Sequence, residues 1–153
     1  MATRKPSFAQ AQLQLQLYDL RREARLREAR DWFLKSYFVE KPEDHQRLAP
    51  AGSPQDFSLR MVVSYWEQAC QMLRHGLLHE ELLFQSTNEF FFVWERLKPI
   101  AQAWRGMMRN PHVSENTEWA AVRYEKWAQK NAPGFLDVVR QYMKQAAQPP
   151  ETA

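Results

Sequence analysis

The aromatic run Phe90–Trp94 most constrains what this chain can fold into. It lies inside a stretch, from about Leu82 to Met108, whose residues otherwise favour helix. A surface helix carries one apolar stripe with charged residues opposite, and this run is too densely apolar for that pattern. The run therefore predicts a helix that is buried on nearly all sides.

Composition supports a helical, globular chain. The chain has 153 residues, 44% hydrophobic and 13% aromatic, which is enough apolar material for one domain with a substantial core. Only four glycines are present, which disfavours a turn-rich β architecture. We therefore expect an all-α fold: a single bundle of five to six helices with a long N-terminal helix and an aromatic-rich core.

Helix-capping residues and prolines divide the chain into segments. Ser53 followed by Pro54 predicts a helix start, and Gly76 predicts the end of the same helix. A kink or a restart is expected near Thr87, and a bend or a new helix start is expected at Pro99. The predicted organisation is a single helical domain over residues 1–148, a long N-terminal helix over 7–38, a core bundle over 54–147 and a disordered tail over 149–153.

Two later segments have helical patterns of their own. Residues 114–118 offer a capped helix start, with Ser114 as the first capping candidate. Further on, a last amphipathic helix is predicted, and its packed stripe is expected to consist of Phe135, Val138, Val139, Tyr142 and Ala146.

The N-terminal helix carries the leading functional hypothesis, a non-enzymatic interaction domain. Strong helix formers fill its Arg-Glu-Ala-Arg repeats, and an apolar seam runs along it. We expect this helix to serve self-association or the docking of a protein partner. The candidate partner-binding residues are Leu13, Leu17, Leu20, Ala24, Arg21 and Arg25.

Nucleic-acid binding through the same helix is the first alternative. Residues 1–41 contain nine Lys or Arg against five Asp or Glu, so the basic excess of the chain lies here. The arginines are distributed around the helix, and Glu23 and Glu28 interrupt the positive field, so counterion release would be modest. Nucleic acid is therefore a possible partner that the sequence does not favour.

An enzyme with a Glu/His pocket is the second alternative. Its candidate residues are Glu67, His75, His79 and Glu95, carboxylates and imidazoles set among bulky apolar neighbours. The segment from His79 begins like a zinc-protease motif, but Leu83 occupies the position of the second histidine ligand. No residue is assigned to catalysis, to a metal or to a cofactor, and the lone Cys70 is expected to be a small buried side chain.

The sequence also bears on the compartment. With one cysteine the chain cannot form an internal disulfide, which favours a reducing environment. No apolar run reaches about 18 residues, and residues 1–16 lack a signal-peptide core. We therefore expect a cytoplasmic protein without a transmembrane segment.

The middle of the chain resembles a family of small, uncharacterised bacterial helical proteins that is known as a domain of unknown function. The resemblance rests on short packing motifs in the central third to half of the chain. They are Ser64–Glu67, His75–Gly76, Glu80–Leu82, Phe91–Glu95 and Leu97–Pro99. It implies a helical fold and supplies no catalytic residues.

Overall fold

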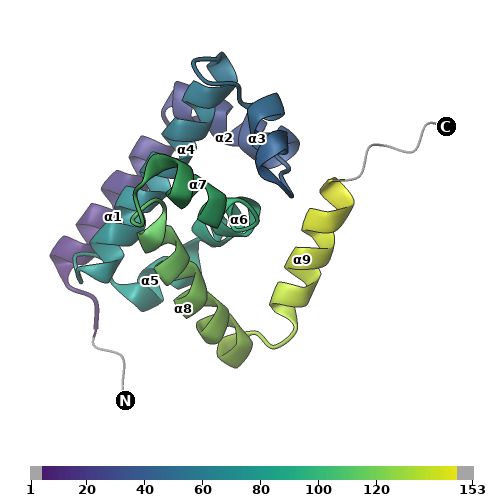
Figure 1. Cartoon of the computed structure of the whole chain (residues 1–153). Helices are drawn as coiled ribbons and strands as arrows, with labels where there is room; N and C mark the ends of the chain where they lie inside the picture. The colour runs from purple at the N-terminus through teal and green to yellow at the C-terminus, as the bar shows by residue number, and fades with distance from the viewer. Residues whose placement is uncertain (1–4, 148–153) are drawn as a thin grey trace.

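The computed structural model describes residues 5–147, and within them every regular element is a helix (Figure 1). The prediction of an all-α fold is therefore confirmed. The helices are α1 (Phe8–Arg21), α2 (Ala24–Ser36), α3 (Pro42–Leu48), α4 (Pro54–Arg74), α5 (Glu80–Ser86), α6 (Glu89–Leu97), α7 (Ala101–Met108), α8 (Glu115–Asn131) and α9 (Phe135–Ala146).

The expected count of five to six helices and the continuous helix over 7–38 were wrong. The described residues form nine helices, and the N-terminal segment breaks between α1 and α2. At the break, Glu23 adopts a non-helical ψ of 138° and its side chain accepts the N–H of Leu26, so it caps α2. The Arg21 carbonyl at the end of α1 accepts a hydrogen bond from Arg30 instead of continuing the helix.

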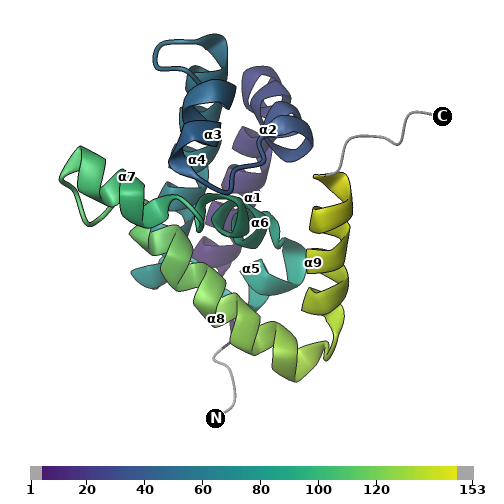
Figure 2. The same ribbon diagram turned by 45° about the vertical axis from the view of Figure 1, so that its right-hand side comes forward.

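The central helices are α4, α6 and α8, and α2 packs against α4. The buried residues of α2 are Leu26, Ala29 and Phe33. Figure 2 shows α6 nearly end-on in the middle of the molecule, between α8 and α4. The side chains of Phe90, Phe91, Val93 and Trp94 are all buried, so the run does form a core helix as predicted. Because α2 belongs to this packing, the core extends beyond the bundle predicted over 54–147.

Local sequence explains where α4 begins and ends. The Ser53 hydroxyl accepts the N–H of Asp56, and Pro54 occupies the first helical position, where no amide donor is needed. After α4, Gly76 adopts a φ of +74°, the left-handed conformation expected of a glycine that follows a helix C-cap. Both ends of this helix were predicted correctly.

The last helix, α9, follows a turn at Gly134 and stands at the side of the molecule (Figures 1 and 2). Its buried residues are Leu136 and Val139, whereas Val138 and Tyr142 are largely exposed. The predicted stripe was therefore right for Val139 and wrong for Val138 and Tyr142, because the buried face of α9 is centred on Leu136 and Val139. The predicted tail over 149–153 lies outside the described residues.

Candidate functional site

The structure separates the residues of the predicted apolar seam. Leu17 is buried, and Leu13 is half-buried against the core, so these two attach α1 to its own domain. Leu20 and Ala24 are exposed. Arg25 is also exposed, whereas the Arg21 side chain reaches toward α6, with its Nη1 at 3.1 Å from the Thr87 hydroxyl and 3.9 Å from Glu89.

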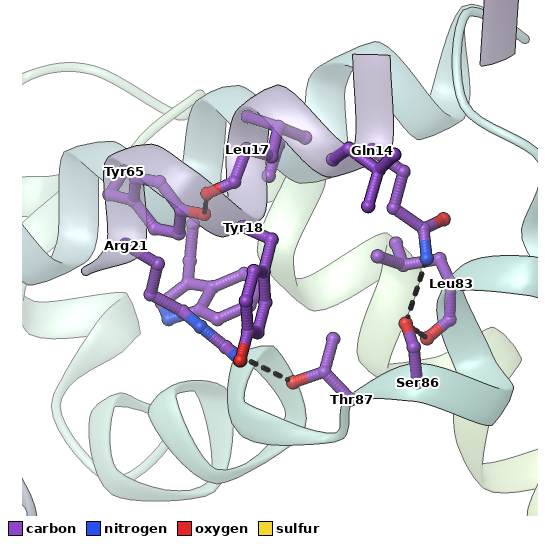
Figure 3. A pocket seen from close by; sticks show the side chains of 11 residues that line it. Gln14, Leu17, Tyr18, Arg21, Tyr65, Leu83, Ser86 and Thr87 are labelled. Carbon is purple, nitrogen blue, oxygen red and sulfur yellow. Dashed lines mark hydrogen bonds between the residues drawn. The ribbon is translucent and has the colours of Figure 1, made fainter. Parts of the chain in front are cut away.

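Beside Leu17, a pocket of about 250 Å³ opens between α1, α4 and α5; we call it the α1 pocket (Figure 3). Its walls are mainly apolar. The apolar and aromatic side chains that line it are Leu15, Leu17, Tyr18, Tyr65, Trp66, Ala69 and Leu83. A cavity with these walls suits an apolar side chain or a small ring better than a charged ligand.

Four polar side chains, Gln14, Arg21, Ser86 and Thr87, frame the α1 pocket. Figure 3 shows the Gln14 side chain reaching from α1 to Ser86 and the Arg21 side chain reaching to Thr87. These two hydrogen bonds join α1 to the end of α5. The Gln14 amide donates to the Leu82 carbonyl and to the Ser86 hydroxyl, but its buried Oε1 has no hydrogen-bond partner in the structure. The polar side chains at this edge of the pocket therefore serve mainly to join α1 to α5.

The floor of the α1 pocket is held by α4. The Tyr65 hydroxyl donates to the Leu17 carbonyl at 2.5 Å, and burial raises the pKa of Tyr65 to about 12. The Trp66 indole N–H donates to Glu89, whose carboxylate also pairs with Arg30. These bonds leave the apolar faces of both rings to form the floor while their polar atoms are satisfied elsewhere.

The rim of the pocket continues into an exposed apolar stripe on α1. The stripe consists of Phe8, Ala11, Leu15 and Tyr18, which follow one another at intervals of three, four and three residues and so share one helix face. Phe8 is 83% exposed, Leu15 66% and Tyr18 50%, so little of the protein covers these side chains. Leu15 and Tyr18 belong to both the stripe and the pocket wall.

The helix that carries this stripe has no charge over most of its length. Residues 6–18 contain no Asp, Glu, Lys or Arg, although such residues make up 25% of the chain. Solvent-facing helix surfaces usually carry charged residues, and loss of charge together with exposed aromatic rings is typical of interface cores. The 3-4-3 spacing of the stripe can be recognised in the sequence. It was missed because Leu13 and Leu17 also fall at helical spacing and were assigned to the binding face instead.

Arginines stand at the end of the stripe. The guanidinium carbon of Arg21 lies 5.3 Å from the centroid of the Tyr18 ring, and that of Arg22 lies 5.8 Å from it. A cation at this distance from a ring face attracts the ring electrostatically. The mouth of the α1 pocket therefore offers cationic groups that favour aromatic over aliphatic side chains.

The residues of the proposed Glu/His pocket have separate surroundings. Both Glu67 oxygens accept hydrogen bonds from the first turn of α8, through Asn116 and Thr117. Glu95 pairs with Arg140 of α9 and with Lys98. Both carboxylates thus hold helices together.

The two histidines of that proposal lie at helix ends. His75 is the exposed residue that ends α4, and the His79 ring nitrogen accepts the N–H of Leu82 as the cap of α5. Across residues 5–147, no three His, Cys, Asp or Glu side chains lie close enough together to hold a metal ion.

The arginines of the basic helix are only partly available to a ligand. Arg21 and Arg30 both lie against Glu89, and the Arg30 guanidinium makes a bidentate pair with it. Arg22, Arg25 and Arg27 are exposed, but the break between α1 and α2 divides the segment that would carry a continuous basic surface.

The fold and the α1 pocket define an all-helical domain with an exposed apolar surface and a built recess beside it. The chain belongs to the family described as a domain of unknown function, DUF4760, whose model matches residues 6–127. That match includes every residue of the α1 pocket and of the stripe, and it stops before α9. Comparison with curated proteins and with solved structures gives no match.

The family assignment confirms the resemblance found in the central motifs and extends it to both ends of that region. In the part of the chain that the structure describes, no helix has both the length and the apolar composition needed to cross a bilayer.

Proposed function

We propose that this domain is a non-enzymatic interaction module that docks a protein partner on the outer face of α1. One observation carries the proposal: the exposed stripe of Phe8, Leu15 and Tyr18 runs directly into the α1 pocket. Binding surfaces of this kind use one buried aromatic or aliphatic anchor in a pocket, surrounded by flatter apolar contacts. The expected cytoplasmic location, suggested by the single Cys70, is part of the same proposal.

The size and chemistry of the α1 pocket support a side chain as its occupant. Engineered cavities of about 150 Å³ bind benzene, so a recess of about 250 Å³ has room for a phenyl or indole group. The neighbouring stripe then covers the rest of an incoming helix, as in the recognition of a helix by a groove.

A titration with indole, followed by amide NMR, tests the pocket directly. Indole presents an apolar ring of a size that the recess can hold, and we expect shifts confined to amides around Leu15, Ala69 and Leu83. Ala69→Leu fills the recess and should abolish them, whereas Ala103→Leu, which adds the same atoms at an exposed position on α7, should not.

Three results would overturn the assignment: no shift at the pocket, shifts spread evenly over the surface, or a response that Ala69→Leu leaves unchanged. Because Ala69 is buried and its replacement could disturb packing, Leu15→Lys provides a second variant at the exposed rim. It should weaken indole binding while the rest of the spectrum stays that of the folded protein.

A further inference from the structure

The geometry points to a second copy of this chain as the partner of α1, with Phe8 of each copy entering the α1 pocket of the other. This inference rests on the proposed docking surface and names its occupant. It also gives a role to Phe8, which is the most exposed of the large hydrophobic side chains in the described residues. The dimer would be a two-fold pair of antiparallel α1 helices.

The spacing of the stripe is complementary to itself in that orientation. When two copies of α1 run antiparallel with their centres at the level of Leu13, Phe8 stands opposite Tyr18 and Ala11 stands opposite Leu15. The same two pairs recur on the other side of the axis, as a two-fold interface requires. In each pair, Phe8 or Ala11 of one helix faces Tyr18 or Leu15 of the other, and these two residues border the pocket.

The orientation puts an aromatic ring where the pocket can take one. Phe8 of one copy arrives at Tyr18 of the other, at the pocket wall, close to the guanidinium groups of Arg21 and Arg22. A phenyl ring fits the volume of about 250 Å³, and its face is attracted by the cations. A parallel pair would instead place Phe8 against Phe8, away from both recesses.

The charge-free character of residues 6–18 removes the usual obstacle to such a pairing. Two identical helices that carry charge on the paired face place like charges near one another, which opposes association. Here the residues beside the stripe include Gln12 and Gln16, whose uncharged amides can both donate and accept hydrogen bonds. A single helix pair is a small interface, so we expect a reversible dimer in the micromolar range.

Sedimentation velocity of the full chain over micromolar to millimolar concentrations tests the dimer. We expect the sedimentation coefficient to rise with concentration, and Phe8→Glu and Leu15→Glu each to weaken dimerisation at least tenfold. Leu20→Glu is the matched control, because Leu20 is 59% exposed on the same helix but lies off the stripe. A chain that stays monomeric, or a dimer as sensitive to Leu20→Glu as to Phe8→Glu, would overturn the inference.

Spin labels at single introduced cysteines test the orientation. In the antiparallel pair, the separation of equivalent labels along the axis grows by about 3 Å for each residue away from the centre, because each helix rises 1.5 Å per residue. Labels at Gln12→Cys should therefore lie close together and labels at Arg22→Cys far apart. Equal separations at both positions would indicate parallel helices and would exclude the entry of Phe8 into the partner's pocket.

The outcomes for the docking surface and for the dimer can be told apart. The indole titration is repeated on Phe8→Ala, which empties the pocket of any second copy. If Phe8→Ala binds indole and the wild-type chain stays monomeric at all concentrations, the docking surface is retained and self-association is excluded. No indole binding by the variant would overturn the docking surface itself.

Discussion

The Glu67 carboxylate on α4 accepts two hydrogen bonds from Thr117, from its main-chain N–H at 2.9 Å and from its hydroxyl at 2.7 Å. The other Glu67 oxygen accepts both the main-chain N–H and the side-chain amide of Asn116. The two main-chain N–H groups belong to the first turn of α8, where they have no partner within the helix. A carboxylate at this position also interacts favourably with the positive end of the helix dipole. A side chain from the middle of one helix thus caps another.

We predict that Glu67→Ala lowers the free energy of unfolding by about 3 kcal/mol, because it leaves four donors in a largely buried position without their acceptor. Glu67→Gln should cost less than Glu67→Ala, since its amide oxygen still accepts while its NH₂ group faces donors. Urea unfolding followed by circular dichroism measures both. Gln68→Ala, at an exposed neighbour on α4, should change stability by less than about 0.5 kcal/mol. A Glu67→Ala variant as stable as that control would contradict the capping role.

This cap shows what the sequence could and could not reveal. Ser114 precedes α8 and is the residue type that usually caps a helix, so the helix start was predicted in the right place. In the structure Ser114 has a left-handed φ of 55°, and its buried hydroxyl has no hydrogen-bond partner among the described residues. The cap comes from Glu67, and no local pattern identifies a residue so distant in the chain.

The division of the N-terminal segment was missed for a related reason. Arg22 and Glu23 are neither glycine nor proline, and the Arg-Glu-Ala repeats favour helix on both sides of them. The break is stabilised by tertiary contacts: Arg30 donates to the Arg21 carbonyl and pairs with Glu89 of α6. Local helix propensity contributes less than such tertiary contacts. The sequence therefore predicted helix correctly on each side of residues 22–23, but it wrongly predicted that the helix continues through them.

The candidate docking surface was predicted only in outline. Apolar residues on the N-terminal helix pointed to a binding surface, but two faces of that helix are apolar, and periodicity does not say which one meets the domain. The structure places Leu17 in the core and Leu15 at the rim of the α1 pocket. The pocket itself joins three segments that are far apart in the sequence, so it could not be predicted.

Acid should destabilise the protein in the range where His45 titrates. Its Nδ1 lies 3.0 Å from the Tyr37 hydroxyl, and its ring packs edge-on against Trp104. Burial lowers the pKa of His45 below its ordinary value of 6.5, although the Asp56 carboxylate opposes this shift. The unfolded chain therefore binds a proton before the folded one does, and stability present above pH 6.5 is lost as the pH falls through the folded pKa.

Urea unfolding between pH 7.5 and pH 5 measures this dependence, and His45→Gln should flatten it. Gln46→Asn changes an exposed neighbour that carries no titratable group and should leave the slope unchanged. The carboxylates of Asp44 and Asp56 have pKa values lowered from 3.8, so they act at lower pH and do not overlap with this window. Identical slopes in the wild type and in His45→Gln would show that the ring titrates as it does in the unfolded chain.

Cys70 should be unreactive in the folded protein. The side chain is fully buried, and burial raises the pKa of its thiol, so the reactive thiolate is neither formed nor accessible. We expect Ellman's reagent to modify it at least about 10³-fold more slowly than an exposed cysteine, because reaction must wait for opening of the core. Ser64→Cys, at an exposed position on the same helix, supplies the fast-reacting reference within one molecule. Rapid modification of both thiols in native buffer would mean that α4 separates readily from α8.

The guanidinium of Arg96 is buried at the end of α2, where, among residues 5–147, it binds main-chain carbonyls and no carboxylate. It donates to the carbonyls of Phe33, Leu34 and Tyr37 at 2.7 to 3.1 Å, and its carbon lies 3.8 Å from the centroid of the Phe38 ring. A cation at a helix C-terminus compensates the free carbonyls and the negative end of the dipole. Burial lowers the pKa of Arg96 to about 10, which still leaves it charged at neutral pH.

Removal of this contact should loosen the end of α2. We expect Arg96→Leu to lower the free energy of unfolding by about 3 kcal/mol or more, because three carbonyls lose their donor inside the protein. Arg96→Lys should lie between Arg96→Leu and the wild type, since one ammonium keeps the charge but cannot span all three acceptors. Lys98→Leu removes a cation two residues further along, whose ion pair with Glu95 is 60% exposed on the lysine side, and should cost less than about 0.5 kcal/mol. Hydrogen exchange would locate the effect: amides that end α2, including that of Tyr37, should exchange faster in Arg96→Leu, and equal protection there would show that the guanidinium does not hold the helix end.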